Sequence, residues 1–294
     1  MIYDAAMRPD TGDHVKIRKT LFLLPLLALL TAFGAPFAPI IKAPAERSVN
    51  LQLGIPAEAD QMIDRSGFAL GYSKSQRQAL WVSYILTAEH LNAPQVRRSN
   101  KFRPDPELRF DPVRPQEYNR TGFDRGHLAP ASDMTYSRKT MEQSFYMTNI
   151  SPQLPACNRG IWKRIETAIR TWARQESQLY VITGPVFLDG EARFMKDTDI
   201  RIPDAFYKVA LDLSPPMKMI AFLVPNRASK RPIRSFVVTV DEVEAVTGMN
   251  FFDNLEDRIE TELEKHSDIA EWQIDTAETS PPAPRSRKKT KPAK

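Results

Sequence analysis

The sequence predicts an α+β fold, and three features of its central part support this class. Several short segments are rich in β-branched and aromatic residues, as strands are. The longer segment 158–175 has apolar residues at helical spacing. A Thr-x-x-Glu capping box at Thr239 is typical of a helix start. Because the helices lie between and after groups of strands, the pattern favours α+β.

The predicted strands begin with 78–91 (QALWVSYILTAEHL), an apolar strand that ends in a turn. The next stretch, 94–122, is rich in Pro, Asp and Arg and should be mostly loop. Four later segments also have the composition of strands: LYVITGPVF (179–187), FYKVALDL (206–213), MKMIAFLVP (217–225) and SFVVTV (235–240).

The helix predicted over 158–175 has one buried face. Its apolar residues recur at positions i, i+4, i+7, i+8 and i+11, which are Ile161, Ile165, Ala168, Ile169 and Trp172. A second helix is predicted to start at the capping box formed by Thr239 and Glu242, and Gly248 suits its C-terminal end.

The N-terminal part of the chain has the pattern of an export signal. Residues 1–20 form a basic flank in which Lys16, Arg18 and Lys19 precede an apolar segment at 21–41. This order is typical of a signal peptide or a membrane anchor. We therefore expect a periplasmic or secreted protein, with the membrane as a partner if the segment is not cleaved.

The rest of the chain divides by composition. Residues 42–50 are expected to be a linker and 51–275 the folded domain. Residues 276–294 should be a disordered basic tail because they are rich in Pro and Lys. The single cysteine, Cys157, excludes an internal disulfide framework. We expect this thiol to be a small packing residue.

The net charge of +5 is mostly a property of the tail, because residues 281–294 hold six basic and no acidic side chains. Two other segments are basic. Residues 95–139 hold ten Lys/Arg against six Asp/Glu, and residues 158–174 hold five against one. Residues 241–275 are acidic, with two basic side chains against twelve. We therefore expect nucleic acid to contact one face of the protein only.

Residues 122–134 (GFDRGHLAPASDM) place Asp124, Arg125 and His127 around Gly126. Histidine is a common general base near neutral pH, and arginine pairs with phosphate. Glycine would permit close approach of a ligand to the backbone. A turn with a salt-bridged histidine explains these residues equally well, so this pattern alone leaves both interpretations open.

A second polar pattern follows at Asn158, Glu166 and Arg170, which lie along one stripe of the predicted helix. Amide and carboxylate oxygens suit Mg²⁺, which takes few protein ligands. A helix N-cap followed by a Glu–Arg ion pair is an alternative explanation. On these residues alone, that alternative is favoured.

Taken together, these segments resemble the DNA/RNA non-specific endonucleases, which are ββα-metal nucleases. The resemblance is carried by DRGH at 124–127, TNISPQ at 148–153 and NRGIWKRIE at 158–166, in this order, and it covers about residues 50–260. It implies a ββα-metal nuclease fold with a central, mainly antiparallel sheet flanked by helices.

The resemblance also implies roles for the matched residues. His127 would be the general base that activates the attacking water. Asn158 would be the direct ligand of a single Mg²⁺ or Mn²⁺ ion, and Glu166 would hold metal-bound waters. Arg125 and Arg170 would contact the phosphate or the leaving group.

Two further residues would support the site, Asp124 by orienting its neighbours and Asn149 as a second asparagine. A further arginine of some family members has no obvious counterpart. Asn100 lies nearest to that position, and the residues around it are Arg98, Lys101 and Arg103. Their role stays open. The aromatic residues Phe145 and Tyr146 are expected to pack, and His90 to be structural.

We expect a Mg²⁺-dependent endonuclease acting on DNA and RNA with little sequence preference, because contacts to backbone phosphates carry no sequence information. No small-molecule cofactor is expected, and a homodimer is left open. One alternative is a non-catalytic nucleic-acid-binding protein on the same fold, although that would require a damaged site. The other is a different metal phosphodiesterase with the same base and metal.

Overall fold

The structure, a computed structural model, describes residues 41–42 and 48–274. The predictions for the basic flank, for nearly all of the apolar segment 21–41 and for the tail 276–294 lie outside these residues. Among the helices in the described ranges, none is long and apolar enough to cross a membrane.

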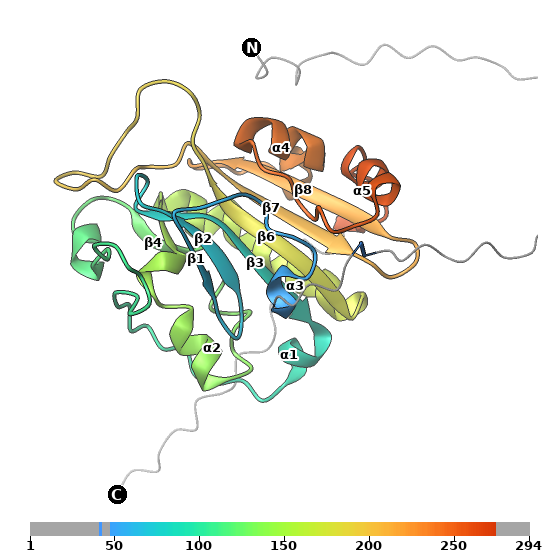
Figure 1. The fold of residues 1–294 in the computed structure, drawn as a ribbon, viewed down its shortest axis with the longest axis horizontal. Coiled ribbons are helices and arrows are strands. Elements are labelled where there is room, and N and C mark those ends of the chain that lie inside the picture. The colour runs from blue at the N-terminus through green and yellow to red at the C-terminus, as the bar shows by residue number, and fades with distance from the viewer. Residues whose placement is uncertain (1–40, 43–47, 275–294) are drawn as a thin grey trace, which may run out of the picture. The chain divides into compact units, whose positions relative to one another are not determined.

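Within the described residues, seven strands form one antiparallel sheet in the order β1-β2-β3-β6-β7-β8-β9 (Figure 1). Their bounds are β1 Gln61–Asp64, β2 Ala69–Ser73, β3 Gln78–Thr87, β6 Gln178–Val186, β7 Ala205–Asp212, β8 Lys218–Pro225 and β9 Val237–Val238. A separate antiparallel pair consists of β4 (Asp124–His127) and β5 (Ile150–Gln153). These sheets and their flanking helices confirm the predicted α+β class.

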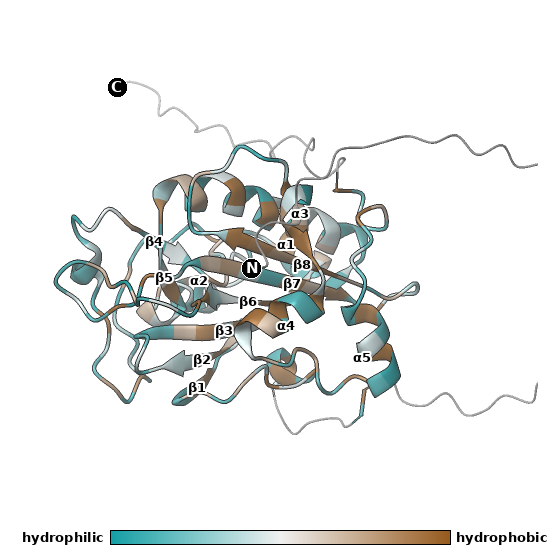
Figure 2. Cartoon of the chain, turned by 90° about the horizontal axis from the view of Figure 1, so that it is seen from above, coloured by the Kyte–Doolittle hydropathy of each residue, from teal (hydrophilic) through white to brown (hydrophobic). Residues whose placement is uncertain are grey.

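The helices cover both faces of the large sheet (Figure 2). One face carries α1 (Ala88–Asn92) and α3 (Lys163–Gln175), and the other carries α4 (Val240–Thr247) and α5 (Asp257–Glu264). A short helix, α2 (Arg138–Gln143), follows β4.

Each face has its own apolar core, because successive side chains of a strand point to opposite faces. On β7, Phe206 and Ala210 belong to the core that contains the buried residues of α3. Tyr207 and Val209 belong to the core that contains Val240 of α4.

The helix expected over 158–175 is regular only from Lys163 onward. Residues Cys157–Trp162 instead form a wider π-helical turn, in which Gly160 has a non-helical backbone (φ −103°, ψ −111°). Glycine adopts such a conformation at little cost because it has no Cβ. The predicted apolar face is nevertheless buried at all five positions, Ile161, Ile165, Ala168, Ile169 and Trp172.

The strand expected over 235–240 is wrong except at Val237–Val238. The residues before it belong to a 3-10 turn at Ile233–Phe236. Thr239 then caps α4 through the predicted capping box with Glu242, and Gly248 ends that helix at φ +68°. The capping hydrogen bonds fix the helix start, so Val240 is helical although its composition suits a strand.

Parts of the expected linker 42–50 contact the body. Lys42 forms an ion pair with Asp257 at 2.5 Å and donates a hydrogen bond to the Asp253 carbonyl. Asn50 is buried and donates to the carbonyl of Arg65 at 2.9 Å.

Candidate active site

A cavity of about 390 Å³ lies between β4, the turn that follows it and the start of α3. Five of the predicted site residues line it: Arg125, His127, Asn158, Glu166 and Arg170. The other charged side chains of its wall are Arg98, Arg159 and Lys163. The structure thus brings both sequence motifs and both basic segments to one cavity.

His127 is held at the end of β4, where it pairs with Ile150 of β5. The buried side chain of Asn149 fixes the chain just after His127. The Asn149 amide accepts a hydrogen bond from the Ala129 N–H and donates to the carbonyls of Ala129 and Ser144, each at 2.9 Å. Asn149 therefore supports the histidine strand and does not line the cavity.

The imidazole of His127 is only 8 % exposed and packs against two aromatic rings. The ring of Phe145 lies edge-on at 4.8 Å and that of Phe102 at 5.5 Å. Burial, together with the nearby positive charge of Arg98, lowers the pKa of His127 to about 3. The imidazole is therefore neutral at physiological pH. Its Nε2 atom accepts or donates no hydrogen bond within the described part of the chain.

Asp124 lies behind the cavity and holds two of its residues. Its carboxylate accepts a hydrogen bond from Asn158 Nδ2 at 2.9 Å and two from Arg159, from Nε at 2.8 Å and Nη2 at 2.5 Å. Burial acts to raise the pKa of Asp124, but these bonds outweigh it and the pKa is lowered. The nitrogen of the Asn158 amide is thus engaged by Asp124, whereas the amide oxygen has no hydrogen-bond partner within the described residues, and Asn158 lines the cavity.

Glu166 and Arg170 lie one helical turn apart on α3. Arg170 donates to Asp133 Oδ1 at 2.8 Å and to Thr167 Oγ1 at 3.1 Å. Burial raises the pKa of Glu166 to about 7, although the positive charges of Arg170 and Lys208 act against this rise. The Glu166 carboxyl therefore changes its charge near neutral pH.

Arg125 is anchored away from its own strand. Its guanidinium donates to the Pro115 carbonyl, from Nη2 at 2.6 Å and from Nε at 3.1 Å, and to Asn119 Oδ1 at 2.8 Å.

The expectation that Gly126 lets a ligand approach the backbone closely is corrected by the structure. A Cβ at this position would lie 2.1 Å from Gln153 Oε1 of β5, so the glycine makes room for the neighbouring strand rather than for a ligand.

Arg98 is the residue of the open 98–103 group that lines the cavity. Its Nε donates to Asn100 Oδ1 at 2.9 Å, and its guanidinium lies 5.0 Å from the centre of the Phe145 ring. Arg103 instead stacks on Tyr146 at 4.5 Å. In the sequence, Arg98 lies in a basic segment and near Asn100, close to the position of the further arginine of some family members.

Arg159 and Lys163 are also part of the cavity wall but were not selected from the sequence. Arg159 directly follows the predicted metal ligand Asn158, which is the one signal that could have identified it. Lys163 is the first residue of α3 and directly follows the π-helical turn that contains Gly160.

The cavity fits a divalent ion with few protein ligands. The free amide oxygen of Asn158 and the carboxylate of Glu166 are hard donors of the kind that Mg²⁺ and Mn²⁺ accept. The metal would keep most of its coordination sphere as water, as Mg²⁺ usually does.

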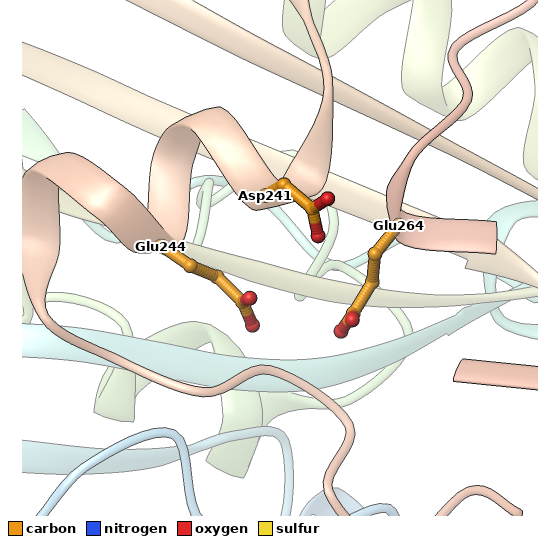
Figure 3. Close-up of side chains that lie close together, drawn as sticks. All are labelled: Asp241, Glu244 and Glu264. Carbon is orange, nitrogen blue, oxygen red and sulfur yellow. The ribbon is translucent and has the colours of Figure 1, made fainter. Parts of the chain in front are cut away.

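A cluster of carboxylates lies elsewhere, on the α4–α5 side of the sheet (Figure 2). Asp241, Glu244 and Glu264 point toward one another, and their oxygens lie within 4.8 Å of one another (Figure 3). Glu264 is buried, and burial together with the charges of Glu244, Glu260 and Asp241 raises its pKa to about 8. This acidic layer and the cavity are on opposite faces of the sheet.

The structure agrees with the packing or structural roles expected for three other residues. Cys157 is buried as a free thiol, and burial raises its pKa to about 11, which does not suit a nucleophile. His90 stacks on the ring of Tyr136 at 3.8 Å. Phe145 is fully buried and serves as a packing partner of His127.

The sequence of this chain is similar to those of known proteins. The family model of the DNA/RNA non-specific endonucleases matches residues 46–258. Nuclease C1 of Cunninghamella echinulata var. echinulata is 34 % identical over 222 residues, which cover 70 % of this chain and 88 % of that protein. Mitochondrial endonuclease G of Bos taurus is 30 % identical over 246 residues, which cover 79 % of this chain and 82 % of that protein.

A solved structure supports the same relationship. The crystal structure of an EndoG/EndoGI complex contains a chain that is 29 % identical to this protein and superimposes with a TM-score of 0.67. The match covers 72 % of this chain and 94 % of that chain. Sequence and fold therefore agree that the chain belongs to the DNA/RNA non-specific endonuclease family.

Proposed function

We propose that this nuclease uses a divalent metal ion, Mg²⁺ or Mn²⁺, to hydrolyse phosphodiester bonds in both DNA and RNA with little sequence preference. One observation carries the proposal. A neutral, buried His127 and the free amide oxygen of Asn158 line the same cavity, and arginines surround them. A base, a hard metal ligand and fixed positive charge are what phosphodiester hydrolysis requires.

Asn158 would hold the metal directly, and Glu166 would hold its water ligands. When bound, the ion supplies positive charge that stabilises the pentacovalent phosphorane and its leaving oxygen. Asp124 would orient Asn158 by accepting a hydrogen bond from its side-chain nitrogen. Such indirect contacts set the direction of a metal ligand.

His127 would accept the proton of the attacking water. Its low pKa keeps the imidazole unprotonated, so the accepting nitrogen is available at every physiological pH. Arg98, Arg125 and Arg170 would bind the phosphate and offset the charge that develops on it. These side chains recognise the nucleic-acid backbone, and nothing in the scheme uses the 2′-hydroxyl. Low sequence preference and action on both DNA and RNA follow.

We propose the cellular location of the protein from its N-terminal sequence pattern alone. The basic flank and the apolar segment 21–41 favour export, to the periplasm or the medium. N-terminal sequencing of the protein recovered outside the cytoplasm tests this, because a cleaved signal peptide leaves a new N-terminus and an anchor does not.

Cleavage assays test the catalytic proposal. Plasmid nicking and RNA degradation are measured with and without EDTA for the wild type, His127→Ala and the control His266→Ala, which alters an exposed histidine after α5. His127→Ala should lower the rate by about 10²–10⁴-fold, whereas the control retains it. Full activity of His127→Ala would exclude this residue as the base. EDTA-insensitive cleavage would exclude the metal, and binding without any cleavage would favour the non-catalytic alternative.

A further inference from the structure

Asp133 is a buried acidic residue in the turn that follows β4, and its side chain is only 1 % exposed. The three residues before it, Pro130, Ala131 and Ser132, line the cavity, whereas Asp133 does not. Its backbone N–H donates to the Pro130 carbonyl at 2.9 Å, which closes the turn. Asp133 therefore lies directly behind the cavity wall, where a charge is unfavourable unless it is paired and hydrogen-bonded.

Side chains from two other elements satisfy the Asp133 carboxylate. Arg170 of α3 donates from Nη1 to Oδ1 at 2.8 Å, and the hydroxyl of Tyr84 on β3 donates to Oδ2 at 3.1 Å. Burial and the negative charge of Asp133 raise the pKa of Tyr84 well above its ordinary value, so this hydroxyl keeps its proton. Because each carboxylate oxygen has its own partner, the carboxylate is held in one orientation.

The same contact holds the guanidinium of Arg170. Its Nη2 atom donates to Thr167 Oγ1 at 3.1 Å, while Nη1 is held by Asp133. The guanidinium is planar, so hydrogen bonds at two different nitrogens fix its plane. These bonds use two of the five N–H donors of the group, and Arg170 lines the cavity. The other donors are available to an anion that enters the cavity.

Charge makes this contact important for Arg170. Its side chain is 14 % exposed, so water screens its charge only partly. Four other cationic side chains line the same cavity and repel it, namely Arg98, Arg125, Arg159 and Lys163. Asp133 opposes this repulsion with a negative charge in direct contact, and such charge-assisted hydrogen bonds are about twice as strong as neutral ones.

We propose that Asp133 is a positioning residue of this nuclease: its buried carboxylate holds Arg170 in the cavity wall so that the guanidinium can bind the phosphate of the substrate. The inference rests on the proposed function, in which Arg170 contacts the phosphate. Asp133 does not line the cavity, so its effect on the substrate must pass through Arg170.

Nucleic-acid affinity tests this inference, because two effects of removing Asp133 have opposite signs. Loss of a carboxylate beside a basic cavity strengthens the attraction for a polyanion. Loss of a positioning contact weakens binding, because Arg170 no longer holds a phosphate. We expect the second effect to prevail, so that Asp133→Ala binds a short DNA duplex about tenfold more weakly. The slope of log affinity against log salt concentration should fall by about 0.9, as it should in Arg170→Gln.

The affinities are measured by fluorescence anisotropy in EDTA and in the His127→Ala background, so that the duplex is not cleaved. Tighter or unchanged binding by a folded Asp133→Ala protein overturns the inference. Tyr84→Phe is the matched control, because it removes the other partner of Asp133 and leaves the contact with Arg170 in place. Its affinity should stay close to that of the parent protein.

Cleavage kinetics test whether the effect passes through Arg170. The values of kcat/KM are compared for the wild type, Asp133→Ala, Arg170→Gln and the double variant. Asp133→Ala should lower kcat/KM by about 10–100-fold in the wild type but by less than about twofold in Arg170→Gln. A purely structural role of Asp133 would give equal losses in both backgrounds, and that result would contradict the inference.

Asp133→Asn replaces Asp133→Ala if the alanine variant does not fold, because asparagine has the same shape and its oxygen still accepts from Arg170. Its loss of kcat/KM should be smaller but should again require Arg170, and equal losses in both backgrounds overturn the inference. If Arg170→Gln changes neither affinity nor kcat/KM, the phosphate contact assigned to Arg170 in the proposed function is wrong, and the inference is wrong with it. If Arg170→Gln impairs both and Asp133→Ala impairs neither, only the inference is wrong.

Discussion

The side-chain nitrogen of Asn158 donates a hydrogen bond to the carboxylate of Asp124, with 2.9 Å between Nδ2 and Oδ2. An ionised carboxylate only accepts hydrogen bonds, so this contact fixes which end of the amide faces Asp124. The amide oxygen is consequently the end that does not contact Asp124. The aspartate of the DRGH sequence therefore orients a residue that lies 34 positions further along the chain.

Asp124→Ala should lower the affinity for the metal ion, and so raise the Mg²⁺ concentration that cleavage requires, while leaving the fold intact. Without its acceptor, the Asn158 amide is free to rotate, and its oxygen is no longer held toward the cavity. Loss of such an indirect contact typically lowers metal affinity or activity by about 10–100-fold. The concentration of Mg²⁺ that gives half-maximal cleavage measures the effect.

Arg159→Ala is the matched control, because it removes the other partner of Asp124 and leaves the Asn158 contact in place. Arg159 is 71 % exposed, so its ion pair contributes little to stability. The variant should need nearly the wild-type concentration of Mg²⁺. An equal rise in both variants would show that the Asp124–Arg159 ion pair, and not the contact between Asp124 and Asn158, determines the metal requirement.

Metal requirement should depend on pH through Glu166 and not through His127. Burial raises the pKa of Glu166 to about 7, and burial with the charge of Arg98 lowers that of His127 to about 3. As the pH falls through about 7, Glu166 takes up a proton and loses the charge that favours a cation, whereas His127 stays neutral. The Mg²⁺ concentration for half-maximal activity should therefore rise below pH 7. In Glu166→Gln this dependence should be absent, and a dependence that persists there would assign it to another group.

Glu264 should make the protein less stable at alkaline pH. Its pKa is raised from an ordinary 4.5 to about 8, so the folded protein binds this proton more tightly than the unfolded chain. The stabilisation is complete below about pH 4.5 and is lost as the pH rises through about 8. Glu264→Gln should therefore melt above the wild type at pH 9, with about 2–4 °C for each kcal/mol.

Glu262→Gln is the control for this measurement, because Glu262 lies on the same helix but is exposed. Differential scanning fluorimetry from pH 5 to pH 9 compares the three proteins. If Glu262→Gln flattened the pH profile as much as Glu264→Gln, the effect would come from net charge and not from the buried carboxyl.

Deleting residues 281–294 should leave cleavage intact and reduce only the salt-sensitive part of nucleic-acid affinity. The segment carries six basic side chains and no acidic one. Its loss should lower the slope of log affinity against log salt concentration by at most about five. Turnover at saturating substrate should be unchanged, and a loss of turnover would show that the tail takes part in the reaction.

The sequence alone is sufficient to predict those parts of the fold in which the spacing of apolar residues determines the local structure. Helix α3 buries the residues that its 3.6-residue spacing selects, from Ile165 to Trp172. The strands predicted at 179–187, 206–213 and 217–225 match β6, β7 and β8 within one residue at each end, whereas β3 already ends at Thr87 and β1 and β2 were not predicted. His127, Asn158 and Glu166 meet because each lies in a contiguous motif that a local element presents to the cavity.

Other features depend on tertiary contacts that no local pattern indicates. Arg98 lines the cavity because its loop packs on Phe145, and Asp133 is important because Arg170 lies opposite to it. Lys208 looks like a solvent-facing position in an alternating strand, yet α3 covers it completely. The backbone break at Gly160, which interrupts the helix predicted over 158–175, is likewise not indicated by the apolar spacing.

The placement of α4 and α5 on the sheet face away from the cavity also has a practical consequence. A bead, an electrode or a fusion partner coupled to an exposed position of α5, such as Glu262, would be separated from the cavity by the whole thickness of the sheet. The tethered enzyme would then present its basic side to a nucleic acid in solution, and attachment there would not obstruct substrate entry.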